Sequence, residues 1–216
     1  MTAQTPRAAI DLFADLTCPW CYVGWAALKQ AAMATPEVRC AVAWRSFLLH
    51  PDMPPEGVDR RAFLKERFGS DPDRTAAVRA ALMGAAAEAG AALDLDAPER
   101  IPSTIDAHRL IHWAAGQGKA EACIDALFEA YWANGLDISQ ASVLTAVAEA
   151  IGMDGALVAD LLAGEADKVA VTQFHAAAAR TGIQGVPVVI VNRTAVLMGA
   201  ESPAAYQRAI RESARP

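Results

Sequence analysis

The stretch Cys18-Pro19-Trp20-Cys21 stands between a short apolar run, residues 8–16, and a segment with helical spacing, residues 19–34. The apolar run is short and bounded, as is typical of a buried strand. The segment that follows spaces its larger apolar side chains, among them Val23 and Leu28, as an amphipathic helix does. The sequence therefore predicts that the two cysteines lie where a strand passes into a helix.

Cys18 is expected at the N-cap of this helix. Pro19 then takes the first helical position, where its missing N–H costs nothing and its fixed φ suits the helix. The Cys18 sulfur would lie near the unpaired amides of the first turn and the positive end of the helix dipole, and both favour the thiolate. Cys21 lies one turn further on and points back toward the first turn, so it is less accessible. We therefore expect Cys18 to be the nucleophile and Cys21 the resolving thiol that attacks a disulfide formed on Cys18.

Composition limits the partners. The chain has 216 residues, 54% of them hydrophobic, and a net charge of −6, which argues against nucleic acid or an anionic membrane as the main partner. The N-terminal residues show no export signal, and no stretch approaches the ~18 uncharged apolar residues of a membrane span. We expect a cytoplasmic protein.

The other two cysteines, Cys40 and Cys123, are isolated from the pair and are expected to pack as small apolar side chains. Four cysteines are too few for a disulfide scaffold. In a reducing cytosol, a lone C-x-x-C pair near a β-α-β pattern indicates redox chemistry.

A zinc site is the alternative use of the pair. His108 and His112 are spaced i, i+4, which places both imidazoles on one helix face, so they would complete a set of four ligands with Cys18 and Cys21. Zinc pairs usually lie in loops and hairpin turns, whereas this pair opens a helix directly after a strand. We therefore expect no metal and no resident cofactor.

The first half of the chain continues with a second strand, residues 38–47, which would close a right-handed parallel β-α-β unit. The proline-rich loop 49–57 follows. From 59 to 182 the pattern is almost purely helical, with six or seven helices. Ser139 is expected to cap one of them.

Strand character returns at residues 186–191 and 194–198, joined by the pair Asn192-Arg193 as a tight antiparallel hairpin. A last helix follows to about Arg211, with Ser202 as its cap and Pro203 at its first position. The predicted order is therefore β-α-β, helical insertion, β-β-α.

This order, with C-P-W-C after the first strand and G-V-P before the third, resembles an α/β thioredoxin fold with a large all-α insertion, and more narrowly the FrnE-type branch of the DsbA-like oxidoreductases. The resemblance implies a thioredoxin-like domain of residues 1–58 and 183–216 and a helical insertion domain of residues 59–182. The matching stretches are Phe13-Ala14-Asp15-Leu16-Thr17-Cys18-Pro19-Trp20-Cys21-Tyr22-Val23-Gly24, Trp44-Arg45-Ser46-Phe47, Ala107-His108-Arg109-Leu110 and Gly182-Ile183-Gln184-Gly185-Val186-Pro187.

The resemblance also implies substrate-binding residues. Pro187 would be cis and lie across from the dithiol, which leaves the backbone of Val186 free to pair with an extended substrate segment. Trp20 would offer an apolar contact to the substrate or cover the disulfide. His108 would face the dithiol and stabilise the thiolate, unless it is a helix histidine with local partners.

Four further polar residues carry weaker expectations. Asp15 is expected to bond to loop amides rather than to tune the thiol. Arg45 is expected to reach solvent, with an anionic group as the alternative. Relatives often have Asn where this sequence has His50 and Ser103, so substrate specificity is expected to differ.

The function expected from these residues is that of an enzyme, a thiol-disulfide oxidoreductase acting on protein or small-molecule thiols and disulfides. A glutathione-dependent isomerase or transferase, of the 2-hydroxychromene-2-carboxylate isomerase or kappa-class type, is the alternative. Those enzymes typically show Ser at the active position, where this chain has Cys18. Glutathione remains open as a co-substrate, and a homodimer is left open as well.

Overall fold

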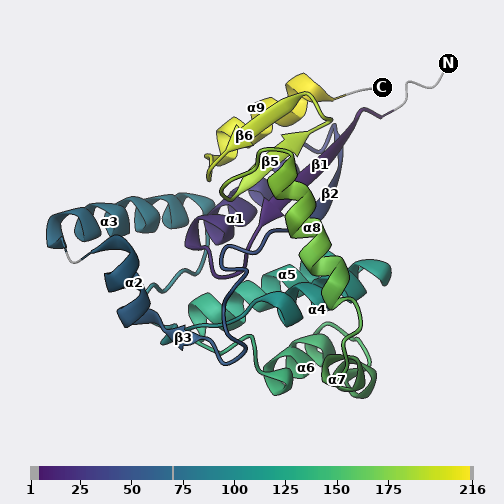
Figure 1. The fold of residues 1–216 in the computed structure, drawn as a ribbon. Coiled ribbons are helices and arrows are strands. Elements are labelled where there is room, and N and C mark those ends of the chain that lie inside the picture. Colours follow the sequence, from purple (N-terminus) through teal and green to yellow (C-terminus); the bar gives the residue numbers. More distant parts are fainter. Residues whose placement is uncertain (1–4, 70, 215–216) are drawn as a thin grey trace.

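The computed structural model describes residues 5–69 and 71–214. At its centre lies a four-stranded sheet with the order β2-β1-β5-β6 (Figure 1). β1 and β2 are parallel, whereas β5 is antiparallel to both β1 and β6. The predicted α/β fold, with β-α-β, a helical insertion and β-β-α in succession along the chain, is confirmed. The strands are β1 (Arg7–Ala14), β2 (Arg39–Ser46), β5 (Val188–Val191) and β6 (Ala195–Met198).

One face of this sheet forms the base of the core. Leu12 of β1 lies opposite Val189 of β5, and Ile10 lies opposite Val191. All four side chains are at most 1% exposed. Helix α1 (Pro19–Met33), which connects β1 to β2, packs together with α9 (Pro203–Ser213) and adds its buried side chains to the same cluster.

The insertion is mainly helical, with seven α-helices among the described residues and a π-helical turn, η1 (Glu129–Ala133), that continues α5. Its aromatic side chains Phe128, Tyr131 and Trp132 are buried in the core. The helices are α2 (Arg60–Phe68), α3 (Pro72–Ala89), α4 (Ile105–Gly116), α5 (Ala120–Phe128), α6 (Ala141–Ala150), α7 (Gly155–Ala163) and α8 (Lys168–Arg180).

Two details differ from the sequence-based expectation. β3 (Val58–Asp59) and β4 (Arg100–Ile101) form a small antiparallel ladder that the sequence did not predict. Two residues per strand are too few to produce a recognisable alternation of apolar and polar side chains. The helix expected to start at Ser139 begins instead at Ala141. The Ser139 hydroxyl bonds to the Asp137 carboxylate at 2.6 Å and is therefore occupied by a local turn.

α8 joins the insertion to the sheet, and Figure 1 shows it running from the helical layer up along the strands. It packs against both α4 and β2. His175 on α8 accepts a hydrogen bond from the Leu48 N–H at 3.2 Å, and its ring lies edge-on to Phe47 with the centroids 4.8 Å apart. The helix that ends the stretch 59–182 therefore covers the sheet as well as the insertion.

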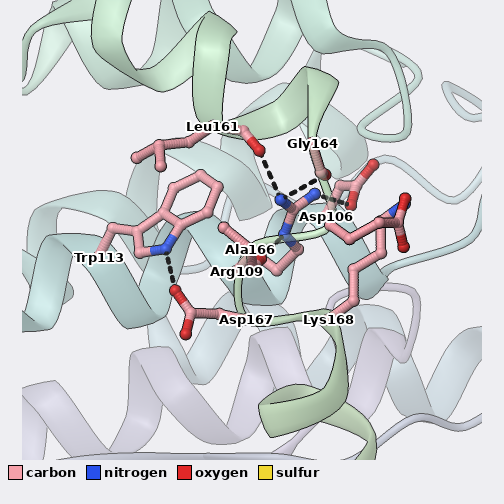
Figure 2. A network of polar contacts seen from close by, with 9 residues as sticks. Asp106, Arg109, Trp113, Leu161, Gly164, Ala166, Asp167 and Lys168 are labelled. Carbon is pink, nitrogen blue, oxygen red and sulfur yellow. Dashed lines mark hydrogen bonds and ion pairs between the residues drawn. The ribbon is translucent and has the colours of Figure 1, made fainter.

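A buried arginine ties α4 to the connection between α7 and α8 (Figure 2). The Arg109 side chain is completely buried and donates to the carbonyl oxygens of Ala166, Leu161 and Gly164 at 2.5, 2.6 and 2.9 Å. It also pairs with Asp106 at 2.7 Å. These bonds bind carbonyl groups at the end of α7 and in the connection that follows it. Arg109 is therefore a structural part of the insertion.

No helix among the residues from 5 to 214 that are described is both long and apolar enough to cross a membrane.

Candidate active site

Cys18 is the N-cap residue of α1 and Pro19 its first residue, as predicted. The backbone of Cys18 is extended, with φ −90° and ψ 113°, and its carbonyl accepts the Cys21 N–H at 3.0 Å. The Cys18 side chain makes no capping hydrogen bond, which differs from the expectation that the sulfur would bond to first-turn amides. The thiol donates instead to the carbonyl oxygen of Val186, at an Sγ to O distance of 3.7 Å.

The loop of residues 184–187, called the Pro187 loop below, thus lies against the nucleophile. The peptide bond between Val186 and Pro187 is cis. Pro187 accepts the N–H of Gly199 at 2.8 Å, whereas the N–H of Val186 has no hydrogen-bond partner among the described residues. An unpaired N–H beside the dithiol leaves room for an extended segment to add there.

Gly24 of α1 lies close to Pro187 and to the Tyr206 hydroxyl, and the sequence analysis assigned no role to Gly24 or Tyr206. A Cβ on Gly24 would lie 3.2 Å from Cγ of Pro187 and 3.4 Å from the Tyr206 hydroxyl. Tyr206, fully buried on α9, donates to the carbonyl of Gly199 at 3.4 Å. A glycine inside a helical pattern was the one signal available, because such a residue often marks a close approach.

The two cysteines have different environments. Cys18 is 5% exposed and Cys21 is completely buried. Burial raises the pKa of the Cys21 thiol well above its usual value, and the hydrogen bond with Cys18 and the charge of Cys18 raise it further. Cys21 is therefore held as a thiol behind a Cys18 that faces the Pro187 loop.

Asp15 lies under the loop that leads into Cys18, and its side chain is 1% exposed. Its carboxylate accepts the Leu49 N–H at 2.6 Å and the Thr17 N–H at 3.5 Å, which confirms the expected bonding to loop amides. Burial alone would raise the pKa of Asp15, but the neighbouring His108 side chain and the hydrogen bond from the Leu49 amide outweigh it and lower this pKa. A buried, ionised carboxylate therefore lies close to the dithiol.

His108 is completely buried, with Trp44 on one side of its ring and Asp15 on the other. It therefore presents no surface to a substrate, and its expected role as a substrate-binding residue is corrected. The reason is the position of α4, which places this side of the helix inside the core.

The four residues of the alternative zinc site are not brought together. His112 is exposed on α4, with its ring 6.2 Å from that of Phe174, whereas His108 points inward. Within residues 5–69 and 71–214, no three His, Cys, Asp or Glu side chains are grouped as metal ligands.

Three further residues from the sequence analysis are Trp20, His50 and Arg45. Trp20 is half-buried, and both of its expected roles stay predictions. His50 stacks edge-on against Phe63 at 4.9 Å, and burial lowers its pKa. Arg45 pairs with Asp11 of the neighbouring strand at 2.6 Å, so its partner is a side chain of the protein itself.

The last residues to place from the sequence analysis are Cys123, Cys40 and Ser103. Cys123 is completely buried, as expected, and burial raises its pKa to about 12. Cys40 is half-buried and keeps part of its surface accessible, and Ser103 is half-buried in the segment before α4.

One contact that anchors the site was not foreseen. The indole N–H of Trp132 donates to the carbonyl of Leu16 at 2.9 Å, which ties the loop before Cys18 to the insertion. The two residues are 116 positions apart, so no local pattern could have indicated this bond.

Comparison with known proteins agrees with this architecture. The crystal structure of the probable DsbA oxidoreductase SCO1869 from Streptomyces coelicolor is 29% identical, with a TM-score of 0.85 over 95% of this chain and 89% of that chain. A structure of 2-hydroxychromene-2-carboxylate isomerase is 16% identical, with a TM-score of 0.69 over 94% of this chain and 95% of that chain. Cytosolic disulfide reductase DsbM from Pseudomonas aeruginosa with GSH is 15% identical, with a TM-score of 0.63 over 94% of this chain and 98% of that chain.

The last two similarities show the shared fold alone. The family described as DSBA-like thioredoxin domain matches residues 9–211. This match spans nearly the whole chain, including the dithiol, the helical insertion and the Pro187 loop. The chain therefore belongs to the DSBA-like thioredoxin domain family.

Proposed function

We propose that this protein is a thiol-disulfide oxidoreductase in which Cys18 attacks the substrate and Cys21 resolves the mixed disulfide. The observation that carries the proposal is the asymmetry of the pair: Cys18 faces the Pro187 loop at the head of α1, whereas Cys21 is fully buried with a raised pKa. A dithiol used in this way needs one accessible sulfur and one that reacts only within the protein.

The reaction has two exchanges. The Cys18 thiolate attacks one sulfur of a substrate disulfide, forms a mixed disulfide, and releases the other substrate sulfur as a thiolate that takes up a proton. Cys21 then attacks the Cys18 sulfur and the second substrate thiol leaves. The substrate disulfide has gained two electrons and the protein dithiol has lost two, and the reverse sequence oxidises a substrate dithiol. The relative reduction potentials set the direction.

Val186 would bind an extended substrate through its N–H, which has no partner in the described part of the chain, with Trp20 and Pro187 forming the apolar walls of the site. The substrates would be protein or small-molecule disulfides, and glutathione would serve as a co-substrate. In support, the similar DsbM is named as a cytosolic disulfide reductase and was crystallised with GSH. We place this protein in the cytoplasm as part of the same proposal. The similarity to an isomerase keeps glutathione-dependent isomerisation as the competing function.

Reduction of insulin, with dithiothreitol or glutathione as electron donor, tests the proposal on the wild type, Cys18→Ser, Cys21→Ser and Cys40→Ser. We expect both dithiol variants to lose activity, because each of them removes one of the two exchanges. Only Cys21→Ser should accumulate a mixed disulfide with the substrate. Cys40→Ser is the matched control and should retain wild-type activity, since Cys40 lies on β2, away from the dithiol.

Full activity of Cys21→Ser would contradict a two-thiol mechanism and favour glutathione chemistry that needs one thiol. Full activity of Cys18→Ser would contradict the assignment of Cys18 as the nucleophile.

A further inference from the structure

Helix α2 and the first half of α3 are poorly covered by the rest of the protein. No residue of α2 is buried, and residues 72–81 of α3 are all exposed. Figure 1 shows the two helices at the left edge of the molecule. We call residues 60–68 and 72–81 the α2–α3 arm.

Large apolar side chains of the arm lie in solvent. Phe68, at the end of α2, is 57% exposed, and Val78 of α3 is 48% exposed. Val78 precedes Leu82 by one helical turn and shares its face. The buried residues of α3 begin at Leu82, and this part of the helix packs against α1. The apolar face of α3 therefore continues along the arm, beyond the part that the body of the protein covers.

The arm is basic, whereas the molecule is acidic. The arm carries six Lys and Arg residues and two Asp and Glu residues, and the whole chain has a net charge of −6. The carboxylates that flank it, Asp59 and Asp71, accept N-terminal amides of α2 and α3 at 2.7 and 3.0 Å. Arg61, Lys65 and Phe68 are spaced i, i+4, i+7, so they share one exposed face of α2. Within residues 5–69 and 71–214, neither of these two cations forms an ion pair.

The base of the arm contacts the segment that leads into Cys18. The Arg60 guanidinium lies over the Trp132 ring, 5.6 Å from its centroid. The indole N–H of Trp132 donates to the carbonyl of Leu16, two residues before Cys18. The nine residues of α2 extend about 13 Å, which about four residues of an extended chain can span. A short extended segment on the arm can therefore reach the dithiol.

We propose that the α2–α3 arm docks polypeptide substrates in which acidic and apolar side chains occur together near the reactive sulfur. The inference rests on the proposed dithiol function and names the class of substrate. Carboxylates of such a segment would pair with Arg61 and Lys65, and its apolar side chains would cover Phe68 and Val78, while its sulfur meets Cys18. The opposite charges of arm and segment favour this occupant, and the acidic remainder of the molecule opposes nucleic acid or an anionic membrane.

The experiment uses peptides with one cysteine activated as a 2-pyridyl disulfide, and protein that carries Cys40→Ser throughout. The Cys18 thiolate attacks the cysteine sulfur of the peptide and forms a mixed disulfide. The pyridine-2-thiolate leaves, takes up a proton and is measured by its absorbance. Three peptides carry a flank of about six residues, enough to extend along α2, in which Leu alternates with Glu, Gln or Lys. The neutral 2-hydroxyethyl 2-pyridyl disulfide, which has no flank, is the reference.

Three double variants are compared with the parent protein. Arg61→Glu with Lys65→Glu reverses two charges of the arm, and Phe68→Ser with Val78→Ser removes its exposed apolar side chains. The matched control, Arg39→Glu with Arg193→Glu, makes the same change in charge at two exposed positions. These lie at the start of β2 and after the end of β5, at the end of the sheet away from Cys18. All six side chains are exposed, so each variant is expected to fold.

We expect the parent protein to reach half of its limiting rate at the lowest concentration with the Glu peptide and at the highest with the Lys peptide. Charge reversal on the arm should raise this concentration for the Glu peptide about tenfold, as the loss of two exposed ion pairs would do, and lower it for the Lys peptide. The limiting rates should not change, because docking away from the reacting atoms acts on binding alone.

Salt separates the two contributions. At about 1 M salt, which screens charges beyond about 3 Å, the differences between the three peptides should disappear. Phe68→Ser with Val78→Ser should weaken all three peptides severalfold at any salt concentration. The control should match the parent protein, and every variant should react with the reference disulfide at the parent rate.

Equal half-saturating concentrations for the three peptides would overturn the docking role of the arm and leave the dithiol function standing. A slower reaction of the arm variants with the reference disulfide would overturn it too. So would a dimer of the parent protein that dissociates on charge reversal in the arm, or binding to phosphatidylserine vesicles without a preference among the peptides. A parent protein that reacts with no substrate, or whose reaction survives Cys18→Ser, would instead overturn the proposed function.

Discussion

Gly24 permits the close contact between α1 and the Pro187 loop, so Gly24→Ala is expected to displace this loop. Alanine gains about 1 kcal/mol of helix propensity over glycine, whereas a methyl group forced into a filled site costs about 1–3 kcal/mol. The new Cβ would meet Pro187 at 3.2 Å, so we expect the cost to exceed the gain by about 1 kcal/mol. Insulin reduction should fall roughly tenfold, because small errors in placing reacting groups have large effects on rate.

The matched control is Gly84→Ala on α3, where a Cβ would meet nothing within 4 Å. This variant should be more stable by up to about 1 kcal/mol and fully active. Urea unfolding and the insulin assay measure both quantities. Equal stability and equal activity of Gly24→Ala and Gly84→Ala would show that the contact with Pro187 contributes to neither quantity.

Among the elements, α4 depends on Arg109 for its attachment to α7 and α8. Arg109→Met keeps the apolar volume but leaves Asp106 and the carbonyl groups of Leu161, Gly164 and Ala166 without this donor. We expect a loss of about 3–5 kcal/mol in the free energy of unfolding, as is typical when one partner of a buried polar network is removed.

Arg79→Met on α3 is the comparison, because Arg79 pairs with Asp96 at the surface, with their side chains 46% and 73% exposed. Arg79→Met should lower the free energy of unfolding by less than about 1 kcal/mol. Denaturant unfolding of both variants gives the two values. A small loss for Arg109→Met would mean that water replaces the missing donor, and that α4 is held by apolar packing alone.

For the molecule as a whole, the sequence predicted the parts that depend on local chemistry. Ser202 caps α9 by accepting the Ala205 N–H, and the turn at Asn192 and Arg193 has the positive φ angles, 48° and 59°, of a tight hairpin. The strand-to-helix junction at Cys18 is also a local feature. Each of these follows from residues within a few positions of one another.

The rest of the site depends on contacts between distant segments. Trp44 and His108 are 64 positions apart, and whether a helix histidine points inward is decided by the tertiary position of its helix. The same holds for Gly24, whose importance depends on the Pro187 loop. The prediction that Ser139 caps a helix was wrong, because its hydroxyl donates to the Asp137 carboxylate in a local turn.

The most direct test of the central claim is the reaction of each cysteine with a thiol-specific alkylating reagent, followed by mass spectrometry at several pH values and after mild oxidation. We predict that Cys18 reacts first at neutral pH, that Cys21 reacts only at much higher pH because its pKa is raised, and that mild oxidation joins the two in one disulfide. Simultaneous alkylation of Cys18 and Cys21 at neutral pH, with no disulfide between them after oxidation, would contradict the account.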